Sequence, residues 1–241
     1  MNDRPKTPRI APEPRATAGE ARPHRGRDRN RAAFVAAGLA LLEKNALADI
    51  GVDDIARLAG LAKATFYNHF ADKDELAAAV VEHVRFDQRA LILRHVEKID
   101  DAARSLARAF CVALRYRLDH PGRARLLEQS APPYKAAVDP INSGVTRHVR
   151  AGLHEGRFTI PNVEVGVIAI LGLMHGCSSF SEPESTFVYM MRAQQLSALM
   201  LRALGLPVAE AEKIAAQEAD IAFGPDAASA DIVELAREQS R

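Results

Sequence analysis

The stretch Gly51 to Lys73, GVDDIARLAGLAKATFYNHFADK, decides the fold of this chain. Apolar residues recur at helical spacing from Val52 to Ala59. Asp53 and Asp54 lie in the first turn of this helix, where the helix dipole favours negative charge. Gly60 can adopt the left-handed conformation that ends a helix, so we predict a short helix followed by a glycine turn.

A second short helix is predicted from Lys63 to Phe70. Phe66 and Phe70 are four residues apart on its inner face. The outward residues are expected to be Lys63, Thr65, Asn68 and His69. Two short helices that cross over a glycine-containing turn form a helix-turn-helix, whose second helix can lie in the major groove of DNA. We place this motif at about residues 54–73.

The runs IARLAG, KATFYNHF and DKDEL in this stretch resemble the DNA-binding domain of the tetracycline-repressor (TetR) family. In that family an aromatic-Tyr-x-His-Phe pattern ends the recognition helix, and here it is matched by Phe66, Tyr67, His69 and Phe70. The resemblance implies an all-α protein with a three-helix DNA-binding domain and a C-terminal helical domain for ligand binding and dimerisation. Two positions depart from the family, which usually has Ser or Thr caps at the positions of Gly51 and Ala62.

The resemblance also implies which residues face DNA. Tyr67 is expected to place its ring in the core and its hydroxyl near a phosphate. Lys73 at the start of a helix opposes the helix dipole, so a phosphate beside it is the better explanation. The expected DNA-binding set is Lys63, Ala64, Thr65, Tyr67, Asn68, His69, Lys73, Gly51, Arg27 and Arg29.

Composition favours a helical protein with a substantial core. The chain has 241 residues, 48% of them hydrophobic, and few alternating strand-like runs. Its net charge of +1 hides an asymmetry, because residues 1–31 hold nine Lys or Arg against four acids. Residues 206–241 hold eight acids against three bases. An acidic C-terminal part is expected to stay away from DNA.

Four segments are expected along the chain. Residues 1–26 form a disordered basic tail rich in Pro and Arg, which either lies along DNA or is simply solvated. Residues 27–72 form the DNA-binding domain, whose first helix runs from Arg27 to Lys44 with Asn45 as a left-handed cap. Residues 73–205 form the effector-binding and dimerisation domain, and residues 206–241 form acidic helices or a loose tail. The core expected for the DNA-binding domain is Phe34, Leu41, Ile55, Leu58, Leu61, Phe66, Tyr67 and Phe70.

A long helix should connect the two domains. Asp72 and Glu75 resemble a capping box, and the helix can continue to about Lys98. It is the only covalent link from the DNA-binding domain to the rest, so we expect it to act as a lever. Further helices are expected at about Ala102–Asp119, Arg123–Ser130, Asn142–Glu155, Asn162–Phe180 and Ser181–Leu204, the last capped through Ser181 and Glu184.

The last two of these helices favour a dimer. One carries small residues near a single face, and the other is apolar around most of its circumference, which one partner helix cannot cover. The family resemblance implies a four-helix bundle with a second copy, although a fully buried helix pair remains an alternative. The expected interface residues are Ala169, Gly172, Gly176, Phe187, Met191, Ala198 and Leu201.

An effector cavity is implied for the central helices, with no cofactor. The expected lining residues are Cys111, Arg115, Tyr116, His148, Met174, His175 and Phe180. We find no nucleotide loop, catalytic motif or metal set, since His83 and Asp87 lack a third ligand. An enzyme is therefore not expected. Two unpaired cysteines and the lack of a long apolar run indicate the bacterial cytoplasm, at the nucleoid.

The sequence therefore indicates a homodimeric, ligand-responsive regulator, and a repressor that leaves a palindromic operator is the preferred hypothesis. An activator, or a DNA-binding protein without an effector, remains an alternative. A helical interaction module of the same fold without DNA binding is a further alternative, favoured only by the missing hydroxyls at Gly51 and Ala62.

Overall fold

Helices form all the regular structure in the part of the chain that the computed structural model describes, residues 21–128, 143–177 and 185–224. The all-α prediction is confirmed. The elements are α1 (Ala21–Leu42), the 3-10 helix η1 (Leu47–Asp49), α2 (Val52–Ala59), α3 (Lys63–Tyr67), α4 (Lys73–Val96), α5 (Ala102–Asp119), α6 (Pro121–Glu128), α8 (Ser143–His154), α9 (Val163–Gly176), α10 (Thr186–Ala203) and α11 (Val208–Phe223).

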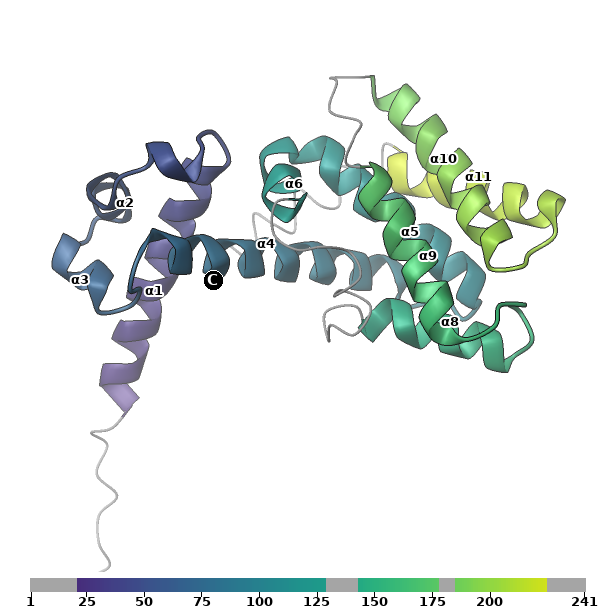
Figure 1. Ribbon diagram of the computed structural model, residues 1–241, viewed down its shortest axis with the longest axis horizontal. Coiled ribbons are helices and arrows are strands. Elements are labelled where there is room, and N and C mark those ends of the chain that lie inside the picture. Colours follow the sequence, from purple (N-terminus) through teal and green to yellow (C-terminus); the bar gives the residue numbers. More distant parts are fainter. Residues whose placement is uncertain (1–20, 129–142, 178–184, 225–241) are drawn as a thin grey trace, which may run out of the picture.

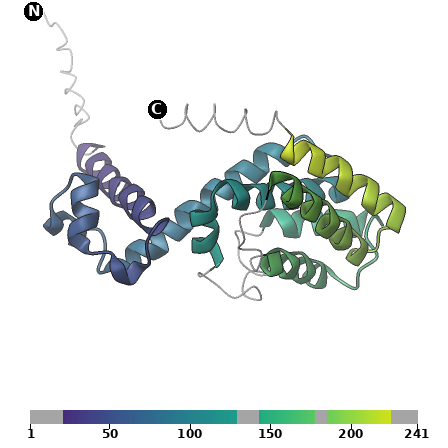
Figure 2. The same cartoon turned by 90° about the horizontal axis from the view of Figure 1, so that it is seen from above.

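The helices form two groups joined by α4. Helices α1, α2 and α3 lie together at one end, and we call them, with η1, the reading unit (Figure 1). Helix α4 leaves this unit and runs into a bundle of α5, α6 and α8 to α11, as the view from above also shows (Figure 2). Its 24 residues span roughly 36 Å, so α4 is long enough to carry movement between the groups.

The predicted glycine turn is confirmed. Gly60 has φ 67°, and the Leu61 amide donates to the Ala56 carbonyl at 3.0 Å, which closes the end of α2. Helix α3 ends at Tyr67 rather than at the expected Phe70. The Asn68 and His69 amides bond three residues back, so the last turn tightens and the helix stops early.

An aromatic cluster forms the core of the reading unit. The Phe34 ring meets Phe66 edge-on at 5.5 Å and Phe70 at 6.3 Å between centroids. The predicted core positions Phe34, Ile55, Phe66 and Phe70 are buried, whereas Leu41 and Leu61 are half-buried. Leu58 and Tyr67 were wrong, because each is 54% exposed. Their expected place is filled from α4, by Leu76, Val80 and Val84.

Helix α1 differs from prediction at both ends. It begins at Ala21, so residues 21–26 are helical and do not belong to a disordered tail; residues 1–20 lie outside the described residues. It ends at Leu42, and Asn45 is not a left-handed cap, since no non-glycine residue in the described ranges has positive φ. Instead, the Asn45 side-chain amide donates to the Leu41 carbonyl at 2.9 Å.

The caps of four later helices follow from single side chains. Asp72 accepts from the Glu75 amide at 2.9 Å, as expected for the start of α4. Asn162 does the same for α9 through the Val165 amide at 2.9 Å. Helix α10 is capped by Ser185, while the expected cap at Ser181 and Glu184 lies outside the described residues. Asp101 accepts from two amides at the start of α5.

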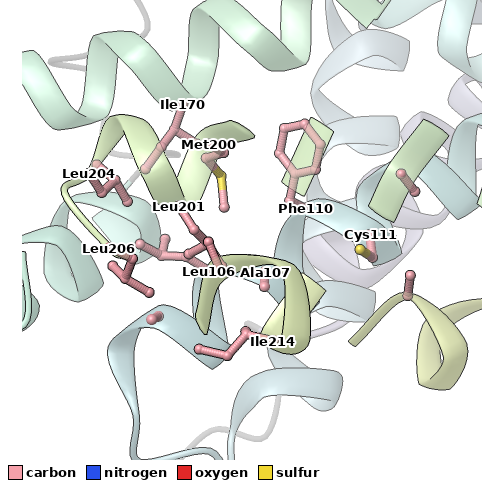
Figure 3. Packing of buried hydrophobic residues seen from close by; sticks show 14 of the residues in the cluster. Leu106, Ala107, Phe110, Cys111, Ile170, Met200, Leu201, Leu204, Leu206 and Ile214 are labelled. Carbon is pink, nitrogen blue, oxygen red and sulfur yellow. The ribbon is translucent and has the colours of Figure 1, made fainter. Parts of the chain in front are cut away.

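The C-terminal bundle has its own core, built around α5. Leu106 and Phe110 of α5 meet Ile170 of α9, Met200 of α10 and Ile214 of α11 (Figure 3). Helix α11 buries seven of its residues, so it is part of this core and not an acidic tail. The C-terminal domain therefore extends past residue 205, and only residues 225–241 lie outside the described part.

A buried ion-pair group fixes α11 to α5. The Glu218 side chain is fully buried, and its Oε1 lies 2.8 Å from the Arg104 Nε. Its Oε2 lies 2.5 Å from the Arg108 Nη2, and Arg108 is itself only 9% exposed. Removing one member of such a group leaves an uncompensated charge in the interior.

We predict that Glu218→Ala lowers the free energy of unfolding by about 3–5 kcal/mol, because Arg108 would remain buried without its carboxylate. Urea denaturation followed by circular dichroism measures this loss. Glu212→Ala, at an exposed position of the same helix, is the matched control and should stay within about 0.5 kcal/mol of wild type. Equal midpoints for both variants would contradict the role of Glu218.

Candidate nucleic-acid interface

Helix α3 presents most of its predicted contact residues to solvent. Lys63, Ala64, Tyr67 and Asn68 are exposed, whereas Thr65 and His69 are half-buried. The Tyr67 ring touches the edge of Phe66, with 5.4 Å between centroids, but the expected core position of the ring is wrong. Tyr67 is 54% exposed, so part of its ring is available at the surface together with the side chain's outer end.

His69 is the most restrained of these residues. Its ring lies 6.0 Å from the Phe34 ring and 6.5 Å from the Phe70 ring, measured between centroids. The aromatic core therefore orients the imidazole while leaving it partly exposed. A side chain held in this way needs little further ordering to bind a partner.

Lys63 has a partner that spacing rules do not indicate. Its Nζ donates to the Asp53 carboxylate at 2.9 Å, which joins the first turns of α2 and α3. The hydrogen bond and the charge of Asp53 raise the pKa of Lys63. The lysine is therefore cationic at physiological pH, but part of its charge is compensated at the surface that would meet DNA.

Lys73 lies differently from the expected phosphate contact. Its Nζ donates to the Ile50 carbonyl at 2.7 Å and to the Leu47 carbonyl at 3.1 Å. Two of its three donors are thus directed inward, to the first residue of η1 and to the residue that follows η1. The phosphate contact expected for Lys73 stays a prediction, and in this structure two backbone carbonyls accept from its amine.

Among the other expected phosphate contacts, the Gly51 amide is already bonded within the protein, whereas Arg27 and Arg29 are exposed. The Gly51 amide is bonded to the Asp54 carboxylate at 3.2 Å, so it is directed at an acid of its own helix. Arg27 and Arg29 are exposed on the part of α1 that projects from the reading unit (Figure 1). Arg31, further along α1, lies over the Phe70 ring at 5.2 Å to its centroid.

The first turns of α6 bind the end of α1, a contact that the sequence did not predict. Arg125 Nη2 donates to the Leu42 carbonyl at 3.1 Å and to the Glu43 carbonyl at 3.0 Å. Arg123 lies between the Glu43 carboxylate at 2.8 Å and the Asp87 carboxylate of α4 at 3.4 Å. We call these two arginines and Glu43 the α6 strap.

A glycine makes the strap possible. A Cβ at Gly122 would lie 2.7 Å from the Glu43 carbonyl oxygen, too close for any side chain without movement of the backbone. Helix α6 begins at Pro121 rather than at the expected Arg123, so Pro121 and Gly122 lie in its first turn. Helix α6 therefore packs directly on the end of the reading unit.

The expected effector-lining residues do not all meet. Burial raises the pKa of the Cys111 thiol to about 12, so it is neutral in the bundle core. Tyr116 is buried in the core of the reading unit instead, where burial raises its pKa.

The other expected lining residues are paired or partly exposed. Arg115 pairs with Asp119 at 2.7 Å. Met174 and His148 are half-buried, His175 is exposed, and Phe180 lies outside the described residues. Burial lowers the pKa of His148.

The expected dimer face is partly wrong. Leu201 is buried in the core of its own bundle, and Ala198 is only 9% exposed. Gly172, Gly176 and Phe187 are exposed, and Ala169 and Met191 are half-buried. The large apolar side chains that α9 and α10 leave exposed, with exposed fractions of 37 to 65%, are Val165, Ile168, Phe187, Val188 and Leu199.

Neither a metal set nor a membrane helix occurs in the described ranges. No three His, Cys, Asp or Glu side chains there are grouped to hold a metal ion. His83 Nε2 lies 3.6 Å from the Asp87 carboxylate, which also faces Arg123. None of the described helices has the length and apolar character needed to span a bilayer.

Two family models match the chain. The model for bacterial regulatory proteins of the tetR family matches residues 34–80. The model for the tetracyclin repressor-like C-terminal domain matches residues 101–217. The first range covers most of the reading unit and the start of α4, and the second covers the bundle as far as α11.

Similar proteins are found by sequence and by structure. The HTH-type transcriptional regulator EthR of Mycolicibacterium smegmatis is 33% identical over 97 residues, which is 37% of this chain and 42% of that protein. The chain thus matches about two fifths of the length of this relative.

Solved structures of similar fold are also found. RolR in complex with resorcinol superposes with a TM-score of 0.64 at 24% identity, over 80% of this chain and 95% of that chain. A gamma-butyrolactone receptor described as ArpA-like gives 0.57 at 18% identity, over 81% and 98%. These structural likenesses show the fold alone.

We predict that Lys73→Met lowers the free energy of unfolding by about 2 kcal/mol, because the carbonyls of Leu47 and Ile50 would lose a charged donor. Thermal and urea denaturation measure this loss. Lys63→Met is the matched control, with an exposed amine, and should leave stability unchanged while weakening DNA binding. If Lys73→Met keeps its stability but binds DNA more weakly, the result would favour a phosphate contact of Lys73 over a structural role.

Asp53→Asn should strengthen binding to DNA of any sequence, since it removes a negative charge beside Lys63 at the candidate interface. Titration of labelled duplexes at several salt concentrations measures the change. We expect the slope of log affinity against log salt to become steeper by up to about one unit. Asp220→Asn, at an exposed position on α11, is the control and should not change the slope. A slope for Asp53→Asn equal to wild type would show that this pair lies away from DNA.

Proposed function

Because the chain belongs to the TetR family of bacterial regulatory proteins, we propose that it is a homodimeric repressor, released from a near-palindromic operator by a small-molecule effector. DNA-binding control of transcription is the activity of the family. The observation that carries the proposal is the exposure of Lys63 and Tyr67 on α3 and of Asn68 directly after it, at the end of the unit that α4 supports. The protein would act in the bacterial cytoplasm.

The reading unit would place α3 in the major groove. Asn68 and Lys63 are exposed near the ends of α3, and Thr65 and His69 are half-buried beside them. Asn side chains pair with adenine edges, whereas Lys reaches guanine edges or phosphates. Arg27 and Arg29 on the projecting part of α1 are suited to phosphates, which supply affinity without sequence information. This division assigns specificity to α3 and general affinity to α1.

A second copy of the chain would cover the exposed face of α9 and α10. Val165, Ile168 and Leu199 are 45 to 47% exposed there, beside the exposed Gly172 and Gly176. Small residues let helices of a second copy approach closely, and apolar side chains around them supply the burial. A twofold dimer would set the two α3 helices about 34 Å apart, one turn of the duplex, and so require a near-palindromic site.

An effector would act on the operator complex through two connections. Helix α4 is the covalent one, and the α6 strap is the other, since Arg123 touches both Glu43, directly after α1, and Asp87 of α4. A ligand that moves α6 or the second half of α4 would therefore move the reading unit. Two structural neighbours support a small-molecule effector, one solved with resorcinol and one described as a gamma-butyrolactone receptor.

We predict that Asn68→Ala weakens operator binding by about 1–3 kcal/mol and relaxes the preference at one base position. The operator is first obtained by selection from random duplexes with the purified protein, and affinity is then measured by fluorescence anisotropy. Gln217→Ala, exposed on α11, is the matched control. Sedimentation should show dimers for both variants. Unchanged affinity and preference for Asn68→Ala, or a monomeric wild type, would refute the corresponding part of the proposal.

A further inference from the structure

A crevice lies where the two groups of helices meet. It has a volume of about 520 Å3, and its walls come from the end of α1, η1, α4 and α6. Small-molecule sites usually have volumes between roughly 300 and 1,000 Å3. The crevice is separate from the bundle core where Cys111 and Met174 lie, and therefore from the effector cavity expected there.

Contacts inside the protein hold the crevice walls in place. Arg125, one of the lining residues, binds the Leu42 and Glu43 carbonyls, which fixes α6 against the end of α1. The Lys73 amine fixes η1 through the carbonyls of Leu47 and Ile50. The site is thus formed before any ligand arrives, so little binding free energy is needed to order it.

The lining combines apolar residues with an excess of cationic ones. Leu47, Ala78, Val81 and Leu126 provide apolar contact surface. The charged residues of the lining are Lys44, Arg85, Arg125 and Glu82, three cations against one anion. Arg85 Nη1 lies 3.2 Å from the Glu82 carboxylate, which leaves Lys44 and Arg125 as the excess positive charge. The nearby Glu43 carboxylate is directed at Arg123.

We propose that this crevice is a second regulatory site, which binds a small molecule with an apolar body and a single carboxylate. The apolar walls would take the body, and Lys44 and Arg125 would bind the carboxylate. The ligand would touch the reading unit, α4 and α6 at once. It would therefore bind best to the arrangement in which the α6 strap is closed, and its binding would favour that arrangement. The regulatory consequence rests on the proposed function, whereas the binding itself does not.

A fluorinated aryl carboxylate tests the site directly. The probe is 4′-fluorobiphenyl-4-carboxylate, with the matching neutral amide as a reference, and fluorine NMR follows binding to the full chain. We expect saturable binding of the acid that is at least tenfold tighter than that of the amide. Ala78→Phe, an exposed α4 position in the crevice, should abolish binding by filling the space. Its circular dichroism melt should match wild type.

Charge variants give the second readout. Lys44→Gln should weaken binding of the acid by about fivefold and leave the amide unchanged, whereas Lys213→Gln, exposed on α11, should change neither. Binding that survives Ala78→Phe, or an acid and an amide that bind equally, would overturn the proposal. If Ala78→Phe melts below wild type, Ala77→Leu in the same wall replaces it under the same criteria.

Operator binding separates this proposal from the previous one. The probe should change operator affinity at least threefold in wild type and leave it unchanged in Ala78→Phe. If the protein binds the acid in the crevice but binds no duplex, the crevice site is supported and the proposed function is refuted. A protein that binds its operator but shows no crevice-dependent binding of the acid would retain the proposed function and lose this site.

Discussion

The structure depends on the way the first turns of α4 are built into the reading unit. Leu76, Val80 and Val84 fill the aromatic core around Phe34, and the Lys73 ammonium holds the carbonyls at the two ends of η1. A helix anchored by a buried apolar stripe and by two charge-assisted hydrogen bonds cannot pivot freely under the unit that it carries. The reading unit and the first half of α4 therefore move as one body. When α4 rotates, α3 rotates with it.

The α6 strap adds a second connection between the two groups of helices, besides α4. Arg123 and Arg125 compensate the carbonyls and the carboxylate at the end of α1, where the helix dipole is negative. Gly122 brings the two backbones close, and Tyr116 and Leu126 add buried surface to the same cluster. Packed contacts of this kind rearrange between discrete states more readily than they stretch. A change in the bundle would reach the reading unit through both α4 and α6.

The surface of the reading unit combines exposed contact residues with internal restraint. Asp53 compensates Lys63, Asp54 binds both the Gly51 amide and Arg57, and the aromatic core orients His69. Acids at the start of α2 stabilise that helix but repel phosphate, so they lower general affinity for DNA. A regulator must distinguish one site from many others, and a weaker background of non-specific binding improves that ratio.

The sequence by itself determined the helix-turn-helix, the bounds of α2 and α5, the Gly60 turn and the long α4, because these depend on periodicity and on caps within a few residues. It also indicated that Lys63 and Asn68 face outward, whereas Thr65 and His69, expected to face outward with them, are half-buried. Only the tertiary structure decided the roles of Lys73, Tyr67, Asp53 and Tyr116, and the inclusion of α11 and Glu218 in the bundle core. The carbonyls that bind Lys73 lie 23 and 26 residues away, and Glu218 lies 114 residues from Arg104. No local pattern encodes such distances, since they arise only when helices pack and buried polar groups must find partners.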